Sequence, residues 1–335
     1  MRRFLHFIIV TLLPLWIVCS SVSAYFFPDT FIPIREWPSF ALAFILFTMG
    51  LTLSIDSLKK VISKPKNAFL GVLGKWTITL GISFLLATLF FANHPELKAG
   101  VLLAGAVPSG TTANLYTFMA GGTLALSIMM SAVDTLIGPF LTPLLMKVTI
   151  NSTIPIDALS MFKQMVLVVL VPIALGLFIQ YKWEHYTVKV KPILPYLSSI
   201  AIIIINLAIV SSAQGILEKN ISLLPLIFFC VFLQIMIPMI LGYIYGILFN
   251  MPKPDRISMF YEFGICNTAL ASILAMHHIS PIAAVPAVAN MITNTFLGAL
   301  IAIAWKPLSE KWESYQMRKG ALLKNRNEQK EKRID

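Results

Sequence analysis

The sequence predicts an all-α polytopic membrane protein with ten transmembrane helices, arranged as two inverted repeats of five. Three observations predict this fold class. Of the 335 residues, 57% are hydrophobic and 12% are charged, about half the charged share of an ordinary soluble domain, and the mean hydropathy is +0.81. The apolar residues form continuous runs of about 20, the length that crosses a bilayer as a helix. Two of these runs are interrupted at corresponding places.

This composition excludes several classes of protein. A cytosolic enzyme, a disulfide-built secreted domain and a disordered chain would all carry more charge or fewer apolar residues. A transmembrane barrel would alternate polar and apolar residues, which these runs do not do. The three cysteines, Cys19, Cys230 and Cys266, lie in apolar segments and form neither a disulfide framework nor a metal-binding spacing.

Ten segments are long and apolar enough to be spans. They cover roughly residues 4–25, 37–55, 67–92, 97–120, 123–146, 160–181, 192–212, 221–249, 256–277 and 281–305. The first segment has a second interpretation, because Arg2 and Arg3, an apolar run and Val22-Ser23-Ala24 resemble a cleaved signal peptide. We favour a retained helix, since the run is long for a signal peptide and its loss would break the symmetry of the halves.

The basic residues set the orientation. The chain has a net charge of +11, and most of its Lys and Arg residues fall on one side if both termini are cytoplasmic. This places the protein in the cell membrane with the basic tail, residues 306–335, inside. The tail could bind anionic lipid or nucleic acid, but a solvated cytoplasmic helix that fixes topology is the favoured interpretation, and no nucleic-acid partner is expected.

Ten spans divide into a first repeat, residues 1–150, and a second, residues 151–305. An odd number of helices in each half requires opposite insertion, as in many secondary transporters. The fourth segment is interrupted at 106–114 and the ninth at 262–268, and each interruption contains an Asn. Broken helices are tolerated in a membrane where they are buried or line a wet cavity. Freed carbonyls can then bind a cation and half-helix N-termini an anion. The alternative is a pair of packing kinks.

Three ionisable residues stand out within the predicted spans: Lys75, Asp134 and Glu262. Such residues are costly in a bilayer and are functional candidates, although a structural ion pair between helices is the alternative. Ser127, Ser131 and Asp134 are spaced to share one helix face, and oxygen ligands of this kind suit sodium. The sequence has no Walker, HExxH or GxSxG motif, so neither ATP-driven transport nor a familiar hydrolase is indicated.

The residues at these positions resemble a known family. The chain is similar over all ten segments to the bile acid:sodium symporter family, in its bacterial branch. The stretches that carry the resemblance are Phe47-Thr48-Met49-Gly50-Leu51-Thr52-Leu53, Pro108-Ser109-Gly110-Thr111-Thr112-Ala113-Asn114, Ala125-Leu126-Ser127, and Glu262-Phe263-Gly264 with Asn267.

The resemblance implies a panel of segments one, two, six and seven that faces a core of the other six, with segments four and nine broken and crossing. It implies sodium-coupled uptake of an organic anion by alternating access. The implied first sodium site consists of the backbone of Ala113 and the side chains of Asn114, Ser127, Ser131 and Glu262. The implied substrate residues are Thr111, Asn267 and Asn294.

The family's second sodium site is altered in this chain. Two Gln residues are usual there, whereas this sequence has Lys75 and Cys266 at those positions, and Asp134 replaces a small hydroxyl residue. We therefore expect one sodium ion, with the Lys75 ammonium in place of the second. There are two alternatives. Lys75 could form a permanent ion pair with Asp134 or Glu262, or it could lose its proton during transport.

The expected function is symport of sodium with a small organic anion. Small carboxylates such as pantoate or a keto acid are implied by the resemblance, rather than bile acids. A sodium/proton antiporter that uses Asp134 and Glu262 as exchanging carboxylates is the second interpretation. A membrane enzyme or receptor is the third, and the missing motifs disfavour it.

Overall fold

The computed structural model describes residues 12–52, 65–150, 154–219 and 221–305. Within these ranges the chain is helical apart from short connections, and one isolated antiparallel bridge joins Ser109 to Cys266. The helices are α2 Leu13–Phe26, α3 Pro28–Phe31, α4 Trp37–Thr52, α6 Pro65–Phe91, α7 Pro95–Gly105, α8 Thr111–Ala120, α9 Leu124–Ile150, α10 Ala158–Met165, α11 Val171–Lys182, α12 Glu184–Val190, α13 Leu194–Lys219, α14 Leu224–Leu248, α15 Lys253–Gly264, α16 Thr268–His278 and a last helix, Pro281–Trp305.

Six helices are long and apolar enough to cross a membrane, or seven if the bent pair formed by α2 and the short helices after it is one span. The helix from Ala158 to Lys182 is one of the six and contains a π-helical turn at Val166–Leu170. The remaining predicted spans are shorter. Within the described residues α4 has 16 residues, and the fourth and ninth segments are each two half-helices, so none of these reaches span length alone.

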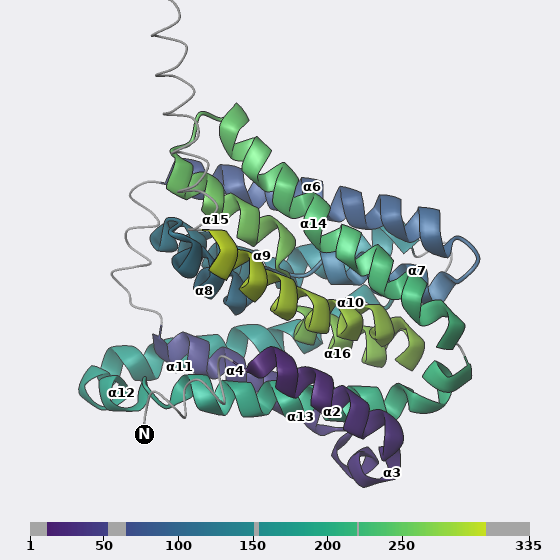
Figure 1. Ribbon diagram of the computed structural model, residues 1–335. Helices are drawn as coiled ribbons and strands as arrows, with labels where there is room; N and C mark the ends of the chain where they lie inside the picture. Colours follow the sequence, from purple (N-terminus) through teal and green to yellow (C-terminus); the bar gives the residue numbers. More distant parts are fainter. Residues whose placement is uncertain (1–11, 53–64, 151–153, 220, 306–335) are drawn as a thin grey trace, which may run out of the picture.

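The helices form two layers. Figure 1 shows α2, α4, α11 and α13 side by side at the bottom, with α6, α7, α9, α14, α15, α16 and the last helix above them. In the lower layer α4 and α11 approach closely through glycines. A Cβ added at Gly50 would lie 2.4 Å from the Ile173 carbonyl oxygen, and one at Gly176 would lie 2.3 Å from that of Phe47. Small residues are therefore required at this contact.

The two broken segments meet in the upper layer. α7 ends at Gly105 and α8 begins at Thr111, while α15 ends at Gly264 and α16 begins at Thr268. The connections run antiparallel: the Gly110 amide donates to the Ile265 carbonyl at 2.9 Å, and the Asn267 amide donates to the Pro108 carbonyl at 2.8 Å. The interruptions lie where the sequence predicts them, and each supplies hydrogen-bonding partners to the other.

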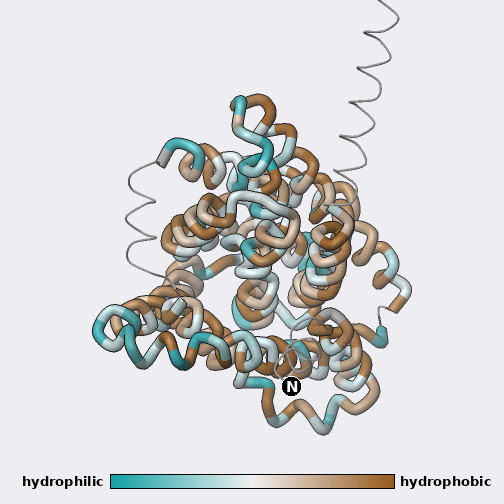
Figure 2. The backbone as a smooth tube through the Cα atoms, turned by 60° about the vertical axis from the view of Figure 1, so that its left-hand side comes forward, coloured by the Kyte–Doolittle hydropathy of each residue, from teal (hydrophilic) through white to brown (hydrophobic). Residues whose placement is uncertain are grey.

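The outer surface of the bundle is apolar. Large side chains such as Phe40, Leu89, Phe140, Leu167 and Phe178 are exposed. Figure 2 shows hydrophobic residues along much of the length of the helices. A soluble protein of this size would bury such side chains, so this surface is one that contacts lipid.

Candidate functional site

Four polar side chains meet beside the break in α15/α16, and we call them the Glu262 cluster: Asn114, Ser127, Ser131 and Glu262. Asn114 lies in the first turn of α8, Ser127 and Ser131 lie one turn apart on α9, and Glu262 lies near the end of α15. Glu262 and the two serines are buried. The resemblance implied that these four residues form a site, and the structure brings them together.

Oxygen atoms outnumber protons in the Glu262 cluster. The Ser127 hydroxyl lies 2.5 Å from Glu262 Oε1 and 2.7 Å from Asn114 Oδ1. The Ser131 hydroxyl lies 3.1 Å from each Glu262 oxygen and 3.4 Å from Asn114 Oδ1. Each hydroxyl has one proton to donate, so two protons face three acceptor oxygens. This arrangement can accommodate a small cation, which would be shared by all of these oxygens.

Ala113 is buried next to Asn114 at the start of α8, and its amide donates to the Gly110 carbonyl at 3.0 Å. Its side chain has no polar atom, so the backbone carbonyl is the group it can offer to a cation. In the described part of the chain no three His, Cys, Asp or Glu side chains are grouped as a metal site. The other side-chain oxygens of the Glu262 cluster belong to Asn114, Ser127 and Ser131 and are neutral. This donor set suits a monovalent hard cation better than a transition metal.

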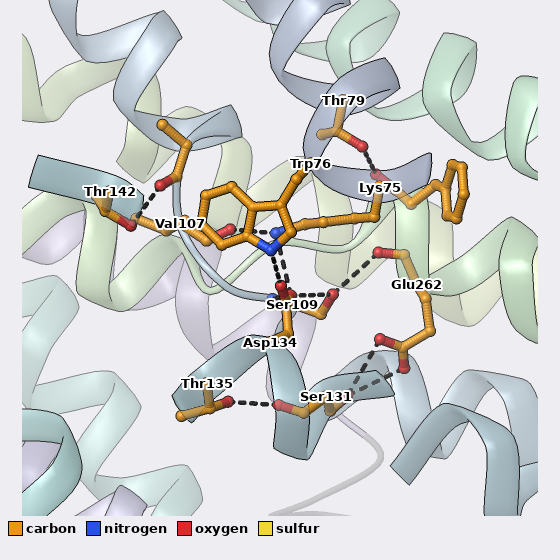
Figure 3. Close-up of polar contacts among 12 residues, drawn as sticks. Lys75, Trp76, Thr79, Val107, Ser109, Ser131, Asp134, Thr135, Thr142 and Glu262 are labelled. Carbon is orange, nitrogen blue, oxygen red and sulfur yellow. Dashed lines mark hydrogen bonds and ion pairs between the residues drawn. The ribbon is translucent and has the colours of Figure 1, made fainter. Parts of the chain in front are cut away.

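A second polar group, which we call the Lys75 pair, lies at the break between α7 and α8. The Lys75 ammonium lies 3.1 Å from Asp134 Oδ2, and both side chains are almost fully buried. Nζ also donates to the Val107 carbonyl at 2.5 Å and lies 4.2 Å from the centre of the Trp76 ring. Figure 3 shows Lys75 and Trp76 reaching from α6 to Asp134 on α9.

Asp134 accepts hydrogen bonds in addition to its ion pair. Its Oδ2 receives the Ser109 amide at 2.6 Å and the Ser109 hydroxyl at 2.9 Å, and the Trp76 indole donates to Oδ1. The same Ser109 hydroxyl lies 3.1 Å from the backbone carbonyl of Glu262. Ser109 thus connects the Lys75 pair to the Glu262 cluster, as Figure 3 shows.

Although the spacing places Asp134 on one face of α9 with Ser127 and Ser131, Asp134 has different partners. The serines contact Glu262, whereas Asp134 contacts Lys75, Trp76 and Ser109. Both Asp134 oxygens have partners within the protein, so the antiporter interpretation, in which Asp134 exchanges ions freely, finds no support.

The predicted substrate residues line one small cavity. Its volume is about 60 Å³, and it lies between α2, α4 and α13 on one side and the two breaks on the other. Thr111, Asn267 and Asn294 all line it, together with Cys266. Asn267 caps α16 by accepting from the Leu270 amide at 3.1 Å, and Asn294 donates to the Cys266 carbonyl at 3.4 Å. The N-termini of α8 and α16 both begin at this cavity.

Sequence reasoning missed three residues of the site: Ser109, Trp76 and Thr79. Ser109 lies within a predicted break, which was the signal for it. Thr79 lies one turn after Lys75 on α6, and its hydroxyl donates to the Phe263 carbonyl at 2.8 Å. Thr79 lies on the same face of α6 as Lys75, so a search for polar residues along that face would have identified it. Nothing in the sequence marks Trp76 apart from its position next to Lys75.

Comparison with known proteins agrees with the family resemblance seen in the sequence. The sequence model described as "Sodium Bile acid symporter family" matches residues 39–220. A Bacillus subtilis protein, "Uncharacterized sodium-dependent transporter YocS", is 32% identical over 300 residues, which are 89% of this chain and 91% of that protein. An Arabidopsis thaliana protein, "Probable sodium/metabolite cotransporter BASS1, chloroplastic", is 28% identical over 308 residues, 90% of this chain and 75% of that protein. This chain therefore belongs to the sodium bile acid symporter family.

Proposed function

We propose that the protein is a secondary active transporter that carries a small organic anion into the cell together with sodium. The observation that carries this proposal is the position of the Glu262 cluster. It is a buried, oxygen-rich site next to a cavity at which two half-helices begin. The names of the sodium-dependent transporter and the sodium/metabolite cotransporter among its relatives support the same function.

Sodium binds at the Glu262 cluster in this proposal. The ligands are the side chains of Asn114, Ser127, Ser131 and Glu262 with the Ala113 carbonyl. A bound cation favours the ionised form of Glu262 and satisfies the acceptor oxygens that the two serine protons cannot. Removal of the cation leaves a buried carboxylate without a counter-charge, so the empty and loaded sites differ strongly in electrostatic free energy.

The anion binds in the cavity lined by Thr111, Asn267 and Asn294. The N-terminal amides of α8 and α16 carry a partial positive charge that favours an anion. The resemblance to the bacterial branch of the family implies a small carboxylate rather than a bile acid, and pantoate or a keto acid is the cargo class that we propose. Sodium at the neighbouring Glu262 cluster reduces the negative potential that would oppose the entry of this anion.

Movement of the two layers provides alternating access. The lower layer, α2, α4, α11 and α13, is the panel, and the upper layer is the core. If the bent α2 pair, α4 and the two broken pairs each count as one span, the described residues contain ten spans. We divide the chain into inverted repeats 1–150 and 151–305 with a cytoplasmic tail at 306–335. The breaks lie in corresponding segments of the two repeats, which supports this division.

The test is uptake by proteoliposomes that contain the full chain. Labelled pantoate and 2-keto acids should accumulate when an inward sodium gradient is imposed, but not with an equal potassium gradient. Glu262→Gln preserves the size of the side chain but removes its charge, and it should abolish sodium-driven accumulation. Equal accumulation in potassium, or full sodium-dependent uptake by Glu262→Gln, would contradict the proposal.

A further inference from the structure

We propose that the ammonium of Lys75 is a built-in cation of the break between α7 and α8, so that the transport cycle binds a single sodium ion. This inference rests on the proposed function and specifies its ion stoichiometry. Three observations support it: the contacts of Lys75, the saturation of Asp134 and the balance of buried charge.

Lys75 places a positive charge at the break between α7 and α8. Val107 follows the last turn of α7, and its carbonyl oxygen points at Nζ from 2.5 Å. Asp134 Oδ2 lies 3.1 Å from Nζ, and the Trp76 ring lies 4.2 Å away. A carbonyl, a carboxylate and an aromatic face all favour a positive charge. Lys75 is 1% exposed, so water contributes little to the stabilisation of this charge.

The Lys75 pair holds the backbone on both sides of Pro108. Lys75 binds the carbonyl of the preceding residue, Val107, and Asp134 binds the amide of the following residue, Ser109. Asp134 therefore accepts from one backbone amide, the Ser109 hydroxyl and the Trp76 indole in addition to its ion pair. A carboxylate with this many donors has little capacity left for a mobile cation.

The buried charges in the described part of the chain are those of Lys75, Asp134 and Glu262. Lys75 and Asp134 cancel, which leaves one negative charge, on Glu262. One monovalent cation at the Glu262 cluster neutralises it. A second cation would place an excess positive charge in a region from which water is excluded, at a high cost.

The direct test counts sodium ions on the purified full-length protein. Equilibrium binding of radioactive sodium should saturate at one ion per chain with a Hill coefficient near one. Saturation at two ions, or a clearly sigmoidal isotherm, would overturn the inference. The count also separates this inference from the proposed function. A wild-type protein that binds no sodium contradicts the proposed function, whereas a wild-type protein that binds two sodium ions contradicts only the inference of a single ion.

A substitution makes the test sharper. Lys75→Ala leaves the Asp134 carboxylate and the Val107 carbonyl without their cation, and both should then recruit sodium, so that binding rises from one ion per chain to two. In the matched control, Lys75→Met with Asp134→Asn, the charge of the pair is removed together with its carboxylate, and binding should stay at one. Glu262→Gln in the same preparation should lose the original ion.

If the Lys75 pair has a purely structural role, Lys75→Ala that folds will still bind one sodium ion, and this outcome would refute the built-in cation. If Lys75→Ala cannot be purified, Lys75→Gln provides the same test, because it also removes the ammonium and leaves Asp134 in place: two bound sodium ions support the built-in cation, and one refutes it.

Discussion

Ser127 and Ser131 each stand between the Glu262 carboxylate and the Asn114 amide oxygen, and neither can donate to both at once. With Glu262 ionised and no cation bound, one acceptor in the cluster is left without a donor. An unsatisfied buried acceptor costs about 1–3 kcal/mol. The cluster is thus arranged so that binding of a cation relieves a cost that already exists in the empty site.

We expect Ser127→Ala and Ser131→Ala each to weaken apparent sodium affinity by about tenfold, the change that corresponds to about 1.4 kcal/mol. Each substitution removes one neutral oxygen ligand and leaves Glu262 in place. The sodium concentration that gives half-maximal uptake measures the effect. Thr149→Val is a matched control, because the Thr149 hydroxyl lies on the same helix but donates at 2.6 Å to the Leu145 carbonyl. Equal sodium dependence of the serine variants and the control would contradict the site.

The serine pair could be predicted from the sequence, but the partner of Asp134 could not. Residues four apart lie on one helix face one turn apart, so Ser127 and Ser131 reach the same carboxylate. Asp134 lies seven residues after Ser127, on the same face but about 10 Å further along the axis. At that distance a side chain meets a different neighbour, and here the neighbour is Lys75 on α6.

At the scale of the elements, the positions of the breaks follow from composition. Pro, Ser and Gly interrupt one apolar run at 106–110, and Glu, Gly and Asn interrupt the other at 262–267. The partners of the freed backbone groups do not follow from it. The Ala106 carbonyl accepts from Thr142 on α9 at 2.5 Å, and the Phe263 carbonyl accepts from Thr79 on α6. These pairings depend on how the helices pack, which no local pattern in the sequence specifies.

The close contact between α4 and α11 predicts how a substitution at the helix interface changes the stability of the protein. Gly176→Leu should destabilise the protein strongly, because even a Cβ at Gly176 would lie 2.3 Å from the Phe47 carbonyl oxygen. Overpacking of this kind costs about 1–3 kcal/mol or more. Thermal melting in detergent would report it as a lower midpoint or a lower yield of folded protein. Leu175→Ala is the control: Leu175 is the neighbouring residue, is exposed, and should tolerate the change. An unchanged midpoint for Gly176→Leu would show that the helices can separate.

At the scale of the whole molecule, the sequence predicts ten spans, and the structure has six or seven helices that qualify by length and composition. The difference arises from α4 and the two broken pairs, whose half-helices are each too short for a span. Hydropathy averages over a window of residues and so reads each broken pair as one helix. The orientation in the bilayer and the inverted relation of the two halves remain predictions.

We expect both termini to be cytoplasmic, with the first helix retained. The loops and tail on that side contain most of the Lys and Arg residues, and α2 packs against α13, where Asn206 donates to the Ile17 carbonyl at 3.1 Å. A fluorescent protein fused after Asp335 should fluoresce, and alkaline phosphatase at the same position should be inactive. An active phosphatase fusion would contradict the orientation, and a mature protein that begins at Tyr25 would contradict the retained helix.

The two breaks also differ in which half of the chain supplies their hydrogen-bonding partners. This difference bears on the order in which the protein is made and inserted. The first break is satisfied largely by residues made in the same half: Lys75 binds the Val107 carbonyl and Asp134 binds the Ser109 amide. The carbonyls of Glu262, Phe263 and Ile265 in the second break instead receive donors from the first half. Because the N-terminal half is synthesised first, it can enter the bilayer with its broken helix already stabilised. We therefore expect the second half to complete its hydrogen bonds on the first, in the order in which the two halves are translated.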